Sequence, residues 1–105
     1  MAAMRAVIWV FPFFTVVTYN RRALFTESLA RECLHAASDK TRRRTPFEDV
    51  ALCLLPDHMH GVWKLPEDDG DFSLRWARIK AGFTRRYLGA GGIGGIKGLR
   101  SKNRT

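Results

Sequence analysis

The sequence is short of cysteine. Its 105 residues include two, Cys33 and Cys53, which stand far apart in apolar surroundings. Two lone cysteines make neither a disulfide framework nor a zinc motif. We interpret both as small buried apolar residues in a protein of a reducing compartment.

Long apolar runs are also missing. Crossing a bilayer takes roughly 20 consecutive apolar residues, and no stretch of this chain approaches that length. The apolar opening segment 6–17 contains Pro12, and basic residues rather than a small-residue cleavage site follow it, which argues against a signal peptide. The sequence therefore predicts a cytoplasmic protein without a membrane partner.

Acidic residues are outnumbered, with 10 Asp and Glu against 18 Lys and Arg and a net charge of +8. Asp71 is the last acid, and nine basic residues follow it. Such a balance favours a polyanionic partner, usually nucleic acid, although a solubilising surface would also be basic. The candidate phosphate contacts are Arg21, Arg22, Arg42, Arg43, Arg75, Arg78, Arg85 and Arg86.

A regular succession of elements fills residues 11–88. Aromatic and β-branched residues predict a strand over 11–19, and helical spacing up to Ala37 predicts a helix capped by Thr26 or Ser28. A basic loop over 39–45 follows. The apolar run 50–55 predicts a strand buried on both faces, and 58–65 predicts the next strand.

A second helix is predicted after Asp71 or Ser73, either of which can cap it. Gly89 ends it. Its apolar residues recur at helical spacing and form one stripe: Phe72, Trp76, Ile79, Phe83 and Tyr87.

The end of the chain changes in character, because segment 89–98 holds six of the nine glycines and 99–105 is basic and polar. We expect residues 89–105 to be a tail with little fixed structure. The folded part, residues 1–88, then has the split βαβ order without its last strand. The missing strand would leave a sheet edge that invites self-association.

The strongest chemical signal is the pair His58 and His60. Side chains two apart on a strand point to the same face, so these imidazoles can share one divalent metal. Asp57 directly precedes them and can orient an imidazole through a hydrogen bond. The alternative is two surface histidines on a half-exposed strand, because a bare His-x-His is common.

A metal held by two protein ligands keeps positions for phosphate oxygens and water. The attacking group must then come from elsewhere, and nothing in the sequence suggests a hydrolase triad. We interpret Tyr87, on the apolar stripe, as a core residue and Tyr19 as a strand-end aromatic. Trp63 is the best candidate for stacking on an unpaired base; the alternative is that its position opposite the histidines buries it against a helix.

Several separated blocks resemble one known family. Residues 13–22, 46–48, 55–60, 63–67, 71–80 and 83–84 resemble, in this order, the REP-associated tyrosine transposases of the HUH superfamily. Met59 takes the place of the bulky apolar residue between the two histidines of that superfamily. The resemblance spans residues 11–88.

The resemblance implies a ferredoxin-like α+β fold, with a central antiparallel sheet and helices on one face. It also implies that His58 and His60 bind Mg²⁺ or Mn²⁺ together with a polar residue of a later helix. In the family, a tyrosine on that helix attacks single-stranded DNA beside a palindromic, REP-like hairpin. The strand is cut and rejoined through a phosphotyrosine intermediate.

The resemblance stops before the helix that carries the nucleophile. Residues 89–105 contain no Tyr, His, Asp, Glu or Gln. We therefore expect a chain truncated or frameshifted near 88–96 that is inactive alone. The alternative is a non-catalytic hairpin-binding module or a decaying remnant. An RNA-binding domain of RRM-like topology is disfavoured, because the sheet lacks a paired-aromatic platform.

Overall fold

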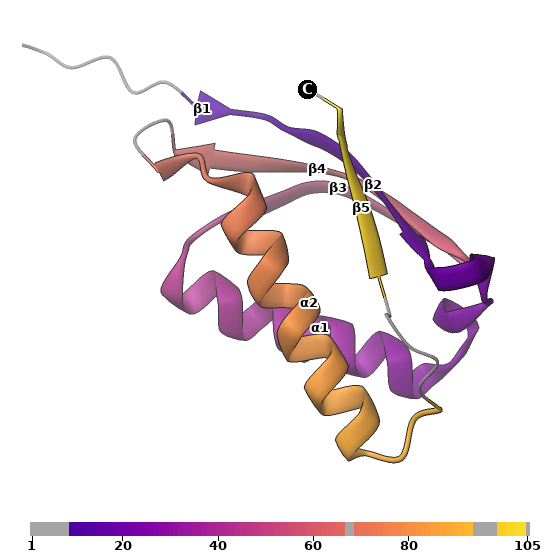
Figure 1. Cartoon of the computed structure of the whole chain (residues 1–105). Coiled ribbons are helices and arrows are strands. Elements are labelled where there is room, and N and C mark those ends of the chain that lie inside the picture. The colour runs from indigo at the N-terminus through magenta and orange to yellow at the C-terminus, as the bar shows by residue number, and fades with distance from the viewer. Residues whose placement is uncertain (1–8, 67–68, 94–98, 105) are drawn as a thin grey trace, which may run out of the picture.

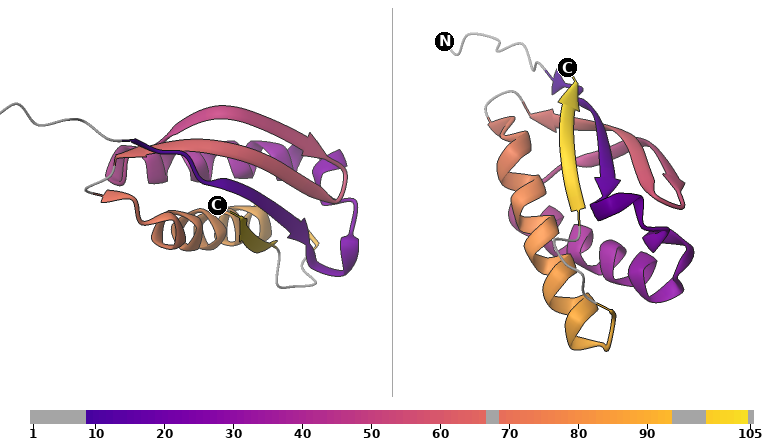
Figure 2. Two further views of the ribbon diagram at one scale, coloured as in Figure 1. Left: turned by 90° about the horizontal axis from the view of Figure 1, so that it is seen from above. Right: turned by 45° about the vertical axis from the view of Figure 1, so that its right-hand side comes forward.

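The computed structural model describes residues 9–66, 69–93 and 99–104. The elements in chain order are β1 (Trp9–Val10), β2 (Phe13–Thr18), the 3-10 helices η1 (Tyr19–Arg21) and η2 (Leu24–Thr26), α1 (Ser28–Arg44), β3 (Glu48–Leu55), β4 (His58–Pro66), α2 (Phe72–Gly89) and β5 (Leu99–Arg104). Both long helices lie on one side of the sheet (Figures 1 and 2). Neither combines the length and the apolar character that a membrane span needs within the described residues.

The sheet is antiparallel, and its strands lie side by side in the order β5, β2, β4, β3. β1 and β2 both pair with β4 in one continuous register, and Phe11 and Pro12 separate β1 from β2. Proline has no N–H to donate and interrupts the ladder there. This strand order, with α1 and α2 as the crossovers, is the ferredoxin-like arrangement, so the predicted α+β fold is confirmed.

β5 corrects the prediction for the end of the chain. Its backbone pairs with β2 from Leu99 opposite Thr18 to Arg104 opposite Phe13. The expectation that the last strand is missing and that the tail has no fixed structure was wrong for residues 99–104, whereas 94–98 lie outside the described residues. A bare strand edge offers unpaired N–H and C=O groups, and they can order a polar segment whose own propensity is weak.

The start of α2 matches its prediction. The Asp71 carboxylate accepts a hydrogen bond from the Leu74 N–H at 2.9 Å. This cap satisfies one of the backbone donors that a helix start leaves unpaired. The whole predicted stripe is buried against the sheet and α1: Phe72, Trp76, Ile79, Phe83 and Tyr87.

α1 extends further than predicted. The segment expected to be a basic loop continues the helix as far as Arg44. The Arg42 guanidinium donates to Asp39 within the helix and to Asp49 at the start of β3, both at 2.7 Å. Basic side chains in the last turn of a helix are favoured by the helix dipole. This local effect explains why residues 39–44 continue the helix although their composition is typical of a loop.

Aromatic rings form the centre of the core. Phe14 of β2 lies with its ring centroid 4.9 Å from that of Trp63 and 5.2 Å from that of Trp76. The two tryptophans stack at 5.2 Å. A side chain at Gly61 would overlap the Phe14 ring, so this position must stay small. Trp63 is 2% exposed, so it is buried against a helix, the second of the two alternatives, and is not a surface on which a base stacks.

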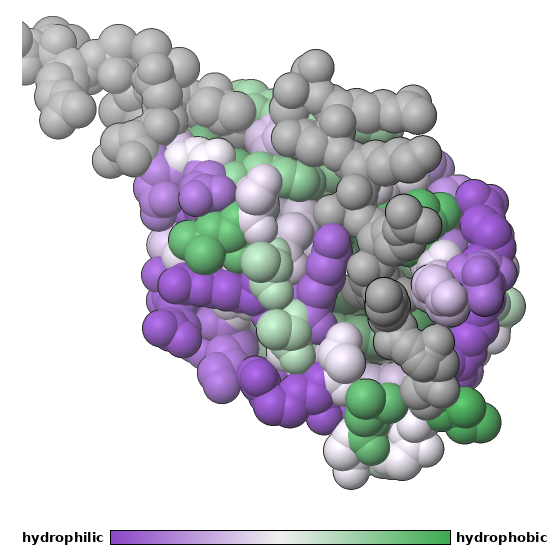
Figure 3. Space-filling model, viewed as in Figure 1, coloured by the Kyte–Doolittle hydropathy of each residue, from purple (hydrophilic) through white to green (hydrophobic). Residues whose placement is uncertain are grey.

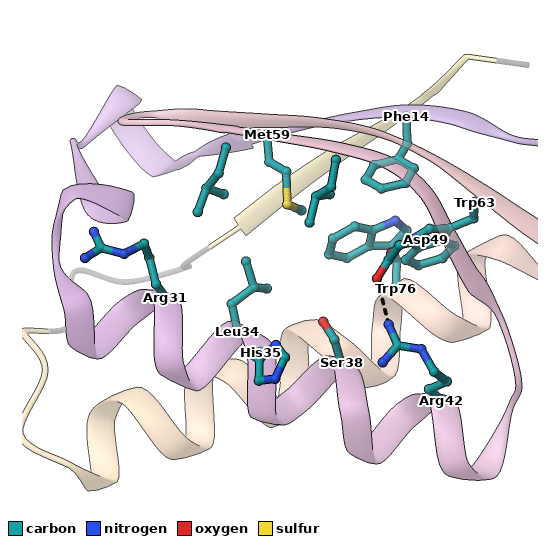
Figure 4. A pocket seen from close by; sticks show the side chains of 12 residues that line it. Phe14, Arg31, Leu34, His35, Ser38, Arg42, Asp49, Met59, Trp63 and Trp76 are labelled. Atoms are coloured by element: carbon teal, nitrogen blue, oxygen red, sulfur yellow. Dashed lines mark hydrogen bonds and ion pairs between the residues drawn. The ribbon is translucent and has the colours of Figure 1, made fainter.

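β3 is more exposed than its apolar sequence predicts. Leu52 is 53% exposed and Leu54 is 37% exposed. Both line an open pocket of about 250 Å³ between β3 and α1, beneath the rings of the core (Figure 4). The strand was expected to be buried on both faces, but it is the edge strand and α1 does not close over it. Cys53 is likewise exposed, so the interpretation of both cysteines as buried holds for Cys33 alone.

Candidate metal centre on the open face of the sheet

The side chains of β4 alternate strictly between two environments. Met59, Gly61, Trp63 and Leu65 are buried against the helices, whereas His58, His60, Val62 and Lys64 are half-buried on the other face. The predicted sharing of faces is therefore confirmed. Because the helices lie on one side only, the two histidines stand on the face of the sheet that the helices leave open (Figure 2).

His58 is oriented by the residue before it. Its Nδ1 lies 2.7 Å from Oδ1 of Asp57, and the other oxygen of that carboxylate accepts from Nε of Arg21 at 2.9 Å. The hydrogen bond from His58, with the nearby Arg21 guanidinium, holds the pKa of Asp57 below its ordinary value. An ionised carboxylate only accepts hydrogen bonds, so Nδ1 of His58 is the donor, and in the neutral ring Nε2 carries the lone pair.

His60 is oriented from the neighbouring strand. Its Nδ1 lies 3.0 Å from Oγ1 of Thr15, which is its ladder partner on β2. A hydroxyl can accept from an Nδ1–H, which leaves Nε2 of this ring for another partner as well. The half-exposed ring of Phe13 stacks beside His60, with an interplanar angle of 18°.

The two imidazoles together offer two nitrogen ligands. Their ring centroids are 4.7 Å apart and the rings stand nearly perpendicular, at 77°. Imidazole nitrogen suits divalent transition metals, whereas Mg²⁺ prefers oxygen ligands. No cluster of three or more His, Cys, Asp and Glu converges among the described residues. The pair thus supplies two of the ligands that such a metal takes, and no third His, Cys, Asp or Glu of the described residues joins them.

Neither tyrosine of the sequence is an evident nucleophile. Tyr87 is 4% exposed, and its hydroxyl donates to Glu27 at 2.5 Å and accepts from Arg22 at 2.7 Å. Burial and the Glu27 carboxylate raise the pKa of Tyr87, so its interpretation as a core residue is confirmed. Tyr19 is 40% exposed in η1, directly after the end of β2.

Arg75 is a structural residue. Its side chain is 0% exposed and donates to the carbonyl of Pro46 at 2.8 and 3.1 Å, and to that of Asp71 at 3.1 Å. It also pairs with Asp69 at 3.2 Å. The prediction that Arg75 contacts phosphate was wrong, because the position of Arg75 beside the buried stripe of α2 directs its guanidinium inward.

The other predicted arginines fall into two groups. Three already contact acids within the chain: Arg21 with Asp57, Arg22 with Glu27, and Arg42 with Asp39 and Asp49. In the part of the chain that the structure describes, no ion pair joins an acid to Arg43, Arg78, Arg85 or Arg86. Three of these four, Arg78, Arg85 and Arg86, also line one groove between α1 and α2, and Arg43 does not, so those three are the better candidates for phosphate contact.

Thr15 is the site residue that the sequence analysis missed. Alternation along β2 places it on the same face as Phe13 and Val17, which a single strand pattern can indicate. Its contact with His60 depends on the register between β2 and β4, and one sequence does not reveal that register.

No family model matches the sequence. Among curated proteins, the chain is 47% identical over 72 residues to the REP-associated tyrosine transposase of Escherichia coli (strain K12), an alignment of 69% of this chain and 43% of that protein. It is 39% identical over 74 residues to a putative REP-associated tyrosine transposase of Haemophilus influenzae, covering 70% of this chain and 42% of that one. The chain therefore spans less than half the length of these curated relatives.

Two solved structures share the fold. One is a REP-associated tyrosine transposase bound to a REP hairpin, with a TM-score of 0.69 and 36% identity, covering 100% of this chain and 62% of that chain. The other is a putative transposase of Deinococcus radiodurans, with a TM-score of 0.72 and 18% identity over 85% of that chain. At that identity the second likeness concerns the fold alone.

Proposed function

Because this chain belongs to the family of REP-associated tyrosine transposases, we propose that it forms the metal-binding part of a DNA strand transferase. The proposed reaction cleaves and rejoins single-stranded DNA beside REP-like hairpins through a phosphotyrosine intermediate. His58 and His60 are the proposed ligands for Mn²⁺ or Mg²⁺. The observation that carries the proposal is that both rings use Nδ1 within the protein and keep Nε2 on one open face.

The residues around the pair have distinct tasks in this proposal. Asp57 and Thr15 each hold one imidazole through its Nδ1, which leaves Nε2 of both rings for the metal in this proposal. A divalent cation held there supplies positive charge that polarises a scissile phosphate and orients it for attack. Phe13, 43% exposed beside His60, offers its ring to an unpaired base next to that phosphate.

Within the described part of the chain, no hydrogen bond or ring contact joins either tyrosine to His58 or His60. Tyr87 is buried and hydrogen-bonded, and Tyr19 lies in η1. We therefore propose that these 105 residues bind hairpin DNA without cleaving it, and that cleavage needs a tyrosine from another polypeptide segment. The second candidate, a purely DNA-binding module, is favoured by the same burial of Tyr87.

Titration of the full chain with Mn²⁺ by calorimetry tests the metal site. We expect one bound Mn²⁺ per chain, and loss of binding in His58→Ala and in His60→Ala. His35→Ala is the matched control, since this third histidine is 80% exposed on α1 and pairs with Asp39. Wild-type protein that binds no Mn²⁺, or an equal loss in the control, would refute the site.

Mixing the chain with Mn²⁺ and a labelled single-stranded DNA hairpin that carries both flanks tests the chemistry. We expect a shifted complex on a native gel and no covalent adduct on a denaturing gel. An adduct that disappears in Tyr19→Phe and in His58→Ala would show that the chain has its own nucleophile. Absence of any complex would remove hairpin DNA as the partner.

A further inference from the structure

A second concave surface lies between α1 and α2. Nine residues line this inter-helix groove of about 140 Å³: Ala37, Lys40, Thr41 and Arg44 of α1, with Arg78, Ala81, Gly82, Arg85 and Arg86 of α2. No strand contributes to it. The groove therefore belongs to the helical side of the molecule, whereas His58 and His60 lie on the open face of the sheet.

Small residues at the helix crossing create this groove. A Cβ at Gly82 would lie 3.3 Å from the Cβ of Ala37 and 3.1 Å from a guanidinium nitrogen of Arg86. Glycine at this position lets the two helices approach closely, as Figure 1 shows where α1 and α2 cross. The long cationic side chains on either side of the crossing are thereby brought to one cleft.

The charge of the groove is of one sign. Five of its nine residues are cations, and none is an acid. In the described part of the chain no carboxylate pairs with any of the five, in contrast to Arg21, Arg22 and Arg42. Like charges held together destabilise the free protein, and an anion in the groove relieves that repulsion. In the view of Figure 3, hydrophilic side chains cover much of this side of the molecule and are interrupted by apolar ones.

We propose that the inter-helix groove binds the sugar-phosphate backbone of a DNA duplex, such as the stem of a hairpin. The choice of DNA rests on the proposed function. Arg78 and Arg85 are seven residues apart on α2, about 10 Å along the axis, and Lys40 and Arg44 are about 6 Å apart on α1. Consecutive phosphates of one strand advance about 3.4 Å along the duplex axis, so cations spread over about 10 Å can contact more than one of them. Such a contact binds the DNA backbone and does not depend on the base sequence.

A membrane surface fits this groove less well. Basic helices that bind lipid place large apolar side chains beside their cations, and these enter the acyl boundary. Here the residues between the cations are alanine, glycine and threonine. The groove is concave and lacks an inserting side chain, which suits a rod of phosphates rather than a bilayer.

Salt-dependent binding of a labelled blunt-ended duplex, measured by fluorescence anisotropy in EDTA, tests the proposal. Arg44→Gln and Arg43→Gln remove the same charge from adjacent positions of α1, but only Arg44 lines the groove. We expect Arg44→Gln to lower the slope of log K against log salt by about 0.9 and Arg43→Gln to leave it unchanged. Arg44→Gln with Arg85→Gln should weaken binding roughly 10- to 100-fold at low salt.

The outcomes separate this proposal from the metal site. A duplex has no single-stranded flank and EDTA removes the cation, so His58→Ala with His60→Ala should bind as the wild type does. Equal decreases of the slope in Arg43→Gln and Arg44→Gln would overturn the proposal that the groove binds the duplex, since the loss of net charge alone would explain them. Loss of duplex binding in the variant that lacks both histidines would also overturn the proposal. So would a protein that binds phosphatidylglycerol vesicles but no duplex. None of these results bears on Mn²⁺ titration at His58 and His60.

Discussion

The two faces of β4 contrast in what holds their side chains. On the helix side, Met59 and Trp63 are fixed by close packing and are at most 2% exposed. On the open side, His58 and His60 are each fixed by one hydrogen bond and remain half-buried. One strand thus contributes to the core and to the proposed metal site at alternate positions. The two functions should therefore be separable by mutation.

The largest expected effect is on the helix side. Trp63→Ala removes a ring that stacks on Trp76 and contacts Phe14, and it should lower the free energy of unfolding by about 3–5 kcal/mol. Val62→Ala, the adjacent position on the open face, should lower it by about 1 kcal/mol. Urea denaturation followed by circular dichroism measures both. Similar losses at the two positions would show that the open face also carries the fold.

Arg75 extends the contrast to charged residues. Arg75→Met keeps the bulk of the side chain but leaves the carbonyl of Pro46 without its donors and removes one of the two donors to that of Asp71, so the free energy of unfolding should fall by about 2–3 kcal/mol. Arg78→Met, one turn along α2, should change it by about 0.5 kcal/mol.

The same two variants should rank the other way in the salt dependence of duplex binding, where the larger effect is expected for Arg78→Met. Arg78 lines the inter-helix groove and Arg75 is buried, so only Arg78→Met should lower the slope, by about 0.9. A lowered slope in Arg75→Met with its fold intact would contradict the structural role assigned to this residue.

The sequence alone predicted the features that depend on local spacing. The alternation of β4 placed both histidines on one face, and the four-three-four-four stripe of α2 predicted its buried side. Features that depend on distant partners were not predictable. Arg75 and Arg78 look alike in sequence, yet one is buried by the loop before β3 and the other faces α1.

The same distinction explains the errors at the edges of the sheet. The apolar run of β3 does not reveal whether a helix covers it, and the structure leaves Leu52 exposed at the edge. The polar residues of β5 gain their strand partner only because β2 lies free beside them. The propensity of a strand depends on its position in the sheet, which a single sequence does not specify.

Asp57→Asn should affect the open face without affecting the fold. An amide can both donate and accept, so it no longer fixes the Nδ1–H tautomer of His58. We expect Mn²⁺ affinity to fall about 10- to 100-fold, with an unchanged urea midpoint. Asp49→Asn, which loses its pairing with Arg42 far from the site along β3, is the control and should leave the affinity unchanged. An unaltered affinity in Asp57→Asn would show that this carboxylate does not orient the ligand.

The smallest expected effect concerns Glu27, at the border of the core. The hydroxyl of Tyr87 donates to its carboxylate, and with Arg22 it holds the pKa of Glu27 below the ordinary 4.5. The folded chain therefore binds this proton less readily than the unfolded chain. Its contribution to stability is complete above the ordinary pKa and is lost as pH falls through the lowered one.

Solvent screening should keep that contribution below about 1 kcal/mol, because the side chain is 38% exposed. Urea midpoints measured between about pH 3 and pH 6 should fall less steeply in Glu27→Gln than in the wild type. Tyr87→Phe keeps the carboxylate but removes the hydroxyl that most lowers its pKa, so it should flatten the profile in the same way. Parallel profiles in all three proteins would show that charge at this border contributes nothing, and that packing alone stabilises the helix side.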